Sequence, residues 1–153
     1  MRETFVQELI GLSRSNPNTV LITGDLGYGV LEPFIKEFPD RYINAGISEQ
    51  AMMGMAAGLA STGKQVFVYS IGNFPTIRCL EQIRNDVCLM NQSVCIVSVG
   101  AGYAYGAQGY SHHALEDIAC MRVMPNMRIL VPSDPVETRI ALKSIMERPQ
   151  PTY

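Results

Sequence analysis

The sequence predicts an α/β fold, with a mostly parallel sheet and helices on both of its faces. Apolar, β-branched runs of strand length, at residues 20–22, 65–70 and 94–99, alternate with segments of helical periodicity. Such runs are typical of strands buried on both faces, as in parallel sheets. The hydrophobic content of 47% and the charged content of 17% fit a doubly covered sheet or a large partner interface. Ligand-binding loops are therefore expected at the carboxyl ends of the strands.

The first half of the chain predicts helix, strand, short helix, strand and helix in that order. Phe5, Leu9 and Leu12 share one helical face, and an Asn-Pro-Asn segment then breaks the helix before a buried apolar run. Ser48 is the expected N-cap of a helix rich in small residues that can pack closely. The expected helices span residues 4–13, 31–37 and 49–61, and the expected strands span 20–22 and 42–45.

The second half continues the alternation. A β-branched and aromatic run predicts a strand, and the segment after it has helical periodicity. Residues 100–111, rich in glycine and tyrosine, predict a loop that is too long to be an ordinary connection. Asp134 followed by a first-turn proline opens the last helix. The expected strands span 65–70, 94–99 and 128–131, and the expected helices span 76–90, 115–122 and 135–146.

Charge and hydropathy exclude several classes of partner. The net charge is −2 without a run of Lys or Arg, so no surface for nucleic acid is expected. The longest apolar-rich stretches, such as residues 51–60, are far shorter than the roughly 20 residues of a membrane-spanning helix. The N-terminus enters a charged amphipathic helix without a signal-peptide core, which predicts a cytoplasmic protein. The four cysteines form no CxxC pair, so buried thiols are favoured over a metal site or disulfides.

Glu49 is the most informative single residue. It lies in the first turn of the Gly/Ala-rich helix, next to apolar residues, where a carboxylate would be partly buried near the positive end of the helix dipole. First-turn glutamates are also common as simple helix-stabilising residues. Position alone therefore leaves both interpretations open.

The surrounding motif resembles a known family. The segment Arg41-Tyr-Ile-Asn-Ala-Gly-Ile-Ser-Glu-Gln50, followed by Met53-Gly-Met-Ala-Ala-Gly-Leu-Ala60, is similar to the pyrimidine-binding domain of transketolases and deoxyxylulose-phosphate synthases. Three further blocks resemble the family in the same order, at residues 78–84, 109–119 and 124–134. Residues 1–153 are therefore identified as one pyrimidine-binding domain of the thiamine-diphosphate-binding fold.

The resemblance implies a transferase that moves a two-carbon ketol unit between sugars with thiamine diphosphate as cofactor. Glu49 takes the position of the carboxylic acid that hydrogen-bonds the cofactor's aminopyrimidine ring and activates it. His112 falls on the family's substrate-facing histidine, where it could bind a sugar hydroxyl or carry a proton. His113 has no counterpart, and a pair of surface-loop histidines is the simpler interpretation without the family match.

Four other residues receive roles from the resemblance. Phe74 is expected beside the pyrimidine ring, and Asp25 in a turn or in the cofactor pocket. Arg78 and Arg2 are candidate binders of a substrate anion, although both could be ordinary helix residues. No metal ligands are expected on this chain.

Half of the family's cofactor site is missing from the sequence. The Gly-Asp-Gly motif that holds Mg²⁺ and the diphosphate does not occur, so both are expected on a diphosphate-binding N-terminal subunit of a split transketolase. The expected assembly is a homodimer or a heterotetramer, and the isolated domain should be inactive. Because another strand should begin near Pro151, the chain is expected to be a fragment that lacks a further C-terminal domain.

Two alternatives within the fold stay open, and one outside it does not. A deoxyxylulose-phosphate-synthase-like enzyme and a non-catalytic assembly domain share the same motifs, although a non-catalytic domain would have little reason to keep both Glu49 and His112. A dinucleotide-binding Rossmann enzyme would need G-x-G-x-x-G after the first strand, and the spacing in residues 24–29 differs. The donor and acceptor sugars are not determined by the sequence.

Overall fold

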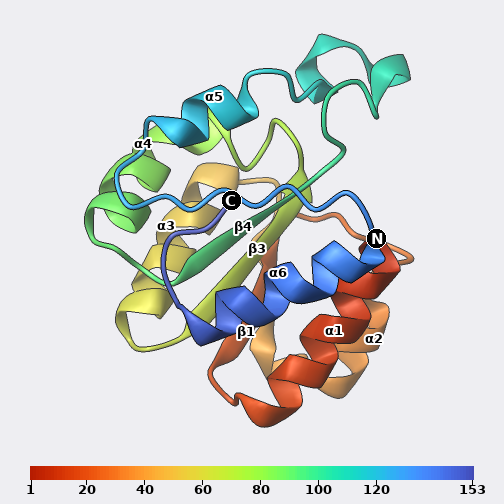
Figure 1. Cartoon of the computed structure of the whole chain (residues 1–153), viewed down its shortest axis with the longest axis vertical. Coiled ribbons are helices and arrows are strands. Elements are labelled where there is room, and N and C mark those ends of the chain that lie inside the picture. Colours follow the sequence, from red (N-terminus) through yellow and green to blue (C-terminus); the bar gives the residue numbers. More distant parts are fainter.

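The computed structural model describes all residues from 1 to 153 and contains a four-stranded parallel sheet (Figure 1). The strands lie in the order β2-β1-β3-β4. In register, Leu21 of β1 lies beside Tyr42 of β2 and Phe67 of β3, and Phe67 lies beside Cys95 of β4. The strand bounds are β1 Thr19–Thr23, β2 Tyr42–Asn44, β3 Gln65–Ile71 and β4 Val94–Val99.

Helices cover both faces of this sheet, which confirms the predicted fold class (Figure 1). α1, α2 and α6 lie on one face, and α3 and α4 lie on the other. The helix bounds are α1 Arg2–Ser15, α2 Glu32–Glu37, α3 Glu49–Ser61, α4 Leu80–Gln82, α5 Asp117–Arg122 and α6 Pro135–Glu147. None of these helices combines the length and the apolar character needed to cross a membrane.

The core is divided by the sheet into two layers. Val20 and Ile22 of β1 pack against the α3 side, whereas Leu21 between them packs against α1 and α6. This follows from the alternation of side chains along a strand. Since both layers are apolar, polar side chains of the central strands are confined mainly to the strand ends.

The segment expected as one helix over residues 76–90 is irregular. It consists of a 3₁₀ turn, η2 (Ile77–Cys79), then α4, then a π-helical stretch, η3 (Ile83–Leu89). The Thr76 hydroxyl donates to the Gly72 carbonyl at 3.0 Å and ties the entry of the segment to the turn before it. At its far end, Asn126 donates to the Cys88 carbonyl at 2.9 Å. The prediction of a uniform helix is therefore wrong, because contacts from outside the segment determine its two ends.

The strand expected over residues 128–131 does not form as a member of the sheet. Arg128 instead makes one parallel bridge to Thr152, and Thr152 bridges Cys95 of β4 on its other side. The backbone of Thr152 thus lies between β4 and Arg128. The prediction is wrong because these residues pair only with the short segment 151–153 and not with β4.

Gly72 marks the closest approach between the end of β3 and the loop after β4. A Cβ atom there would lie 2.7 Å from Ala114 Cβ and 3.1 Å from the Gly100 carbonyl oxygen. We expect Gly72→Ala to lower the free energy of unfolding by about 1–3 kcal/mol, because the overpacked loop must shift. Urea denaturation measures this change.

The matched control is Gly11→Ala in α1, where an added Cβ meets nothing within 4 Å. Helix propensity alone should raise its free energy of unfolding by about 0.5–1 kcal/mol. A Gly72→Ala protein as stable as the wild type would contradict the tight contact.

Candidate functional site

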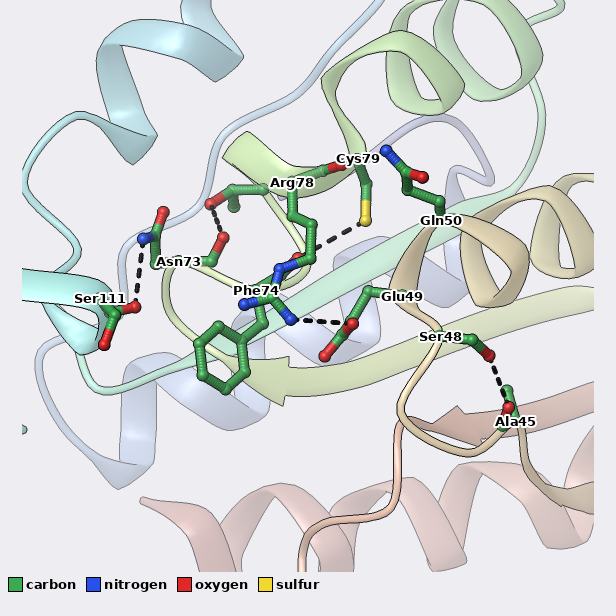
Figure 2. Close-up of polar contacts among 10 residues, drawn as sticks. Ala45, Ser48, Glu49, Gln50, Asn73, Phe74, Arg78, Cys79 and Ser111 are labelled. Atoms are coloured by element: carbon green, nitrogen blue, oxygen red, sulfur yellow. Dashed lines mark hydrogen bonds and ion pairs between the residues drawn. The ribbon is translucent and has the colours of Figure 1, made fainter. Parts of the chain in front are cut away.

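Glu49, the first residue of α3, is a buried carboxylate, with a side chain only 4% exposed. The turn after β1 packs against it, since a Cβ at Gly24 would lie 3.8 Å from Glu49 Cγ. Glu49 Oε2 lies 2.9 Å from Nη1 of Arg78, and this is the only ion pair that it makes (Figure 2). The predicted catalytic carboxyl is therefore buried at the carboxyl edge of the sheet, where loops after parallel strands meet.

Ser48 precedes Glu49 but does not cap α3. Its hydroxyl donates to the Ala45 carbonyl at 2.8 Å, as Figure 2 shows. Gly46 has φ +72°, and the Ser48 N–H turns back to the Gly46 carbonyl at 2.8 Å. The prediction of an N-cap at Ser48 is wrong because this tight turn directs the hydroxyl back to the preceding loop.

Phe74 and Arg78 complete the surroundings of Glu49. The Arg78 guanidinium lies over the Phe74 ring, with Cζ 4.3 Å from the ring centroid. Gln50, next to Glu49 in α3, donates to the Arg78 carbonyl at 3.0 Å. Figure 2 shows the guanidinium between the Phe74 ring and the Glu49 carboxylate. The predicted cofactor residues Glu49 and Phe74 thus lie together, and Arg78 contacts both.

His112 lies on the other side of Phe74. The two rings meet edge to face, with centroids 5.0 Å apart. Ser111 Oγ is 3.1 Å from His112 Nδ1, and Asn73 donates to the Ser111 carbonyl at 3.2 Å. The loop after β3 therefore positions the histidine loop.

His113, which had no assigned role, contacts tyrosines of its own loop. Its ring centroid is 4.9 Å from that of Tyr103 and 6.2 Å from that of Tyr110. These contacts are local to residues 100–113. They give His113 a place in the loop's own packing.

Asp25 is exposed and belongs to a hydrogen-bonded cluster at the ends of β1 and β2. Asn44 accepts from the Asp25 N–H at 2.9 Å and donates to the Asp25 carboxylate at 3.0 Å. Tyr28 also donates its hydroxyl to this carboxylate. The hydrogen bond from Tyr28, and next the one from Asn44, hold the pKa of Asp25 below its usual range. Asn44 and Tyr28 were not predicted, although Asn44 lies within the motif that contains Glu49.

Arg2 lies apart from the other predicted residues. It is exposed at the start of α1 and lines a cavity of about 280 Å³ beside β4, together with Phe5 and Tyr69. That cavity is lined by none of the other five predicted residues. The structure therefore brings together Glu49, Phe74, Arg78 and His112, but not Arg2.

The structure contains no group of three or more His, Cys, Asp or Glu side chains that could hold a metal ion. The polar groups around Glu49 and Phe74 are one carboxylate, one guanidinium and one carboxamide. These groups suit a flat organic ring with hydrogen-bonding nitrogens.

The fold and the site define an α/β domain that offers a buried carboxylate beside an aromatic ring. Residues 1–153 match the family described as "Transketolase, pyrimidine binding domain". The chain therefore belongs to the transketolase pyrimidine-binding domain family, which confirms the predicted resemblance.

Curated relatives agree with this family. One of the two subunits of an apulose-4-phosphate transketolase from Phocaeicola vulgatus is 40% identical over 99% of this chain and 49% of its own length. A putative transketolase C-terminal section of Methanocaldococcus jannaschii is 44% identical over 100% of this chain and 49% of its own length. The chain thus spans about half the length of these relatives.

Solved structures agree on the fold. A chain described as a split gene transketolase, inactive beta4 tetramer, superposes with a TM-score of 0.88 at 40% identity, over 99% of this chain and 49% of its own. A transketolase mutant from Pichia stipitis gives a TM-score of 0.85 at 23% identity, over 99% of this chain and 24% of its own. The second likeness concerns the fold alone.

The buried cysteines near and behind the site should be chemically inert. Burial raises the pKa of Cys79 and of Cys95 to about 12, and that of Cys88 to about 11. In the unfolded chain these thiols ionise near pH 9.0. Folding therefore favours the protonated thiols, and the stability they contribute is present below about pH 9 and lost as the pH rises toward 12.

We expect thiol labelling of the native protein at pH 8 to modify Cys120 first, since it is the one cysteine that is not fully buried. Mass spectrometry of the labelled peptides locates the adducts, and denaturation curves between pH 7 and 11 test the loss of stability. Rapid labelling of Cys79 in the folded protein would contradict its burial.

Proposed function

We propose that this chain is the pyrimidine-binding part of a thiamine-diphosphate-dependent transketolase, which transfers a two-carbon ketol unit between sugars. The observation that carries the proposal is the buried Glu49 carboxyl beside the Phe74 ring. In the family, which is thiamine-diphosphate-dependent, a glutamate at this position contacts the pyrimidine ring.

The residues present fit the pyrimidine part of this cofactor. The space between Glu49 and Phe74 already accepts a flat, nitrogen-rich group, the Arg78 guanidinium. Glu49 would hold the ring by a hydrogen bond to a ring nitrogen, and Phe74 would stack on it. Asp25 and its Tyr28 and Asn44 partners would shape the neighbouring edge of the pocket.

The hard step of the reaction belongs to the cofactor, which when bound supplies the electron sink for breaking a carbon–carbon bond beside a ketose carbonyl. Glu49 holds one proton at its carboxyl in a place largely shielded from water. His112 has Nδ1 beside Ser111, so Nε2 is the nitrogen available to a sugar hydroxyl. Its role would be to bind that hydroxyl or to exchange its proton near neutral pH.

The remainder of the site would come from a second subunit. A diphosphate-binding N-terminal subunit would hold Mg²⁺ and the diphosphate, and the isolated chain would be inactive. One 40%-identical neighbour is described as an inactive beta4 tetramer, which supports both the need for a second subunit and self-association of this one. We propose a homodimer of this chain, or a heterotetramer with its partner, in the cytoplasm.

The sugars are a matter for assay. Relatives of this chain are named for apulose-4-phosphate, for 6-deoxy-6-sulfo-D-fructose and for 1-deoxy-D-xylulose-5-phosphate. A donor panel should therefore include phosphorylated, sulfonated and branched ketoses. Pyruvate belongs in the same panel as a test for the synthase reaction.

Replacement of the catalytic carboxyl is the first test. We expect Glu49→Gln to lower ketol transfer by about 10²–10⁴-fold, because an amide of the same shape cannot exchange the proton. The assay uses the chain mixed with its diphosphate-binding subunit. Isothermal titration of thiamine diphosphate with Mg²⁺ into the same samples measures cofactor binding.

Glu147→Gln in α6 is the matched control, since Glu147 is exposed and belongs to a helix remote from Glu49 in sequence. It should leave turnover and binding unchanged. A folded wild-type complex that binds no cofactor would overturn the proposal and favour a non-catalytic assembly domain.

The two adjacent histidines provide a second matched pair. We expect His112→Gln to lower turnover by about 10²-fold without weakening cofactor binding, because its imidazole is the one that meets Phe74. His113→Gln should stay close to wild type, since its contacts lie within its own loop. Steady-state kinetics over a range of sugar concentrations separates the two, and equal losses in both variants would argue against the role of His112.

A further inference from the structure

The Arg78 side chain lies between the two residues proposed to hold the pyrimidine ring. Its Nη1 is 2.9 Å from Glu49 Oε2, and its Cζ is 4.3 Å from the centroid of the Phe74 ring (Figure 2). The guanidinium therefore uses the buried carboxylate and the aromatic face at the same time.

A guanidinium and an aminopyrimidine share the features that these partners recognise. Both are flat, both stack on aromatic rings, and both carry nitrogen atoms that hydrogen-bond a carboxyl group. A carboxyl oxygen and one ring face offer room for one such group. We propose that Arg78 is a placeholder, which occupies the pyrimidine position in the cofactor-free protein and leaves when the ring binds. This inference rests on the proposed function.

The local structure allows the side chain to move while its backbone stays fixed. The Arg78 carbonyl accepts a hydrogen bond from Gln50 at 3.0 Å, and the neighbouring Cys79 is buried. The Arg78 side chain itself is 45% exposed, in contrast to the 4% of Glu49. A long side chain that is half in water loses little when it exchanges one set of partners for solvent.

The placeholder answers a physical problem of the cofactor-free site. A buried carboxylate without a partner is costly, and Arg78 provides the missing cation and donor. The consequence is a competition between the side chain and the ring. A side chain that holds the position about nine-tenths of the time weakens the apparent cofactor affinity about tenfold.

The competition predicts an unusual gain of affinity on removing a cation from a site for an anionic cofactor. We expect Arg78→Ala to bind thiamine diphosphate with Mg²⁺ about tenfold more tightly than wild type, as measured by isothermal titration into the complex with the diphosphate-binding subunit. The matched control is Arg84→Ala, because Arg84 is exposed nearby and hydrogen-bonds only the side chain of Asn85. Its affinity should equal that of wild type.

A second measurement uses the free guanidinium ion as a substitute for the deleted side chain. Millimolar guanidinium chloride should weaken cofactor binding to Arg78→Ala, whereas equal sodium chloride should not, and wild type should respond equally to both salts. If Arg78→Ala does not fold, Arg78→Gln keeps a flat side chain without the charge and should also bind more tightly. The Arg78 Nε–H resonance in ¹⁵N-arginine-labelled wild type should shift when cofactor saturates the complex.

The outcomes separate this inference from the proposed function. Unchanged or weaker binding by folded Arg78 variants, with wild type binding normally, would overturn the placeholder and favour Arg78 as an anion binder. Binding by the variants alone would support a placeholder that is nearly always in place. No binding by any of the proteins would overturn the proposed function and the placeholder together.

Discussion

Burial of the sheet on both faces is the constraint that locates the site. Because β1 and β3 are covered by apolar layers on each side, polar side chains near the middle of the sheet must gather where the strands end. All four strands are parallel, so the loops after them share one edge. The turn at Gly24, the helix start at Glu49 and the turn at Phe74 follow three different strands and meet there.

This arrangement leaves one charge in an unfavourable place. Glu49 is nearly inaccessible, and its single cation reaches it from a half-exposed position. Such a pair satisfies the buried carboxylate but contributes little net stability, since solvent screens the exposed partner and ordering the arginine costs entropy. The pair is therefore suited to exchange for another group, and the carboxylate stays in place because α3 fixes it.

The sequence was sufficient for the fold class and for the residues at the edge of the sheet. Apolar runs of strand length predicted β1, β3 and β4, and the position of Glu49 before a small-residue helix predicted a partly buried carboxyl. What the sequence could not predict are contacts between distant segments. The Arg78–Glu49 pair joins two loops, and the Asp25–Asn44 hydrogen bonds depend on how β1 and β2 pair.

The failed predictions have the same physical origin. Periodicity over residues 76–90 is helical, yet Thr76 and Asn126 bind backbone carbonyls of neighbouring segments and alter both ends. Residues 128–131 have strand composition, yet a strand needs a neighbour along its length, and only one bridge to Thr152 is present. Local propensity was overridden by tertiary contacts in each case.

The turn at residues 72–76 connects the proposed cofactor pocket to the substrate loop. The Gly72 carbonyl accepts from both Thr76 and Ser98, so this turn is fastened to β4. Its next residue, Asn73, holds the backbone of Ser111, and Phe74 meets His112. A shift of the loop would therefore move His112 and Phe74 together, whereas Glu49 is held separately by α3. Changes in the glycine- and tyrosine-rich loop can thus alter the sugar-facing side of the pocket while the carboxyl that would meet the cofactor keeps its position.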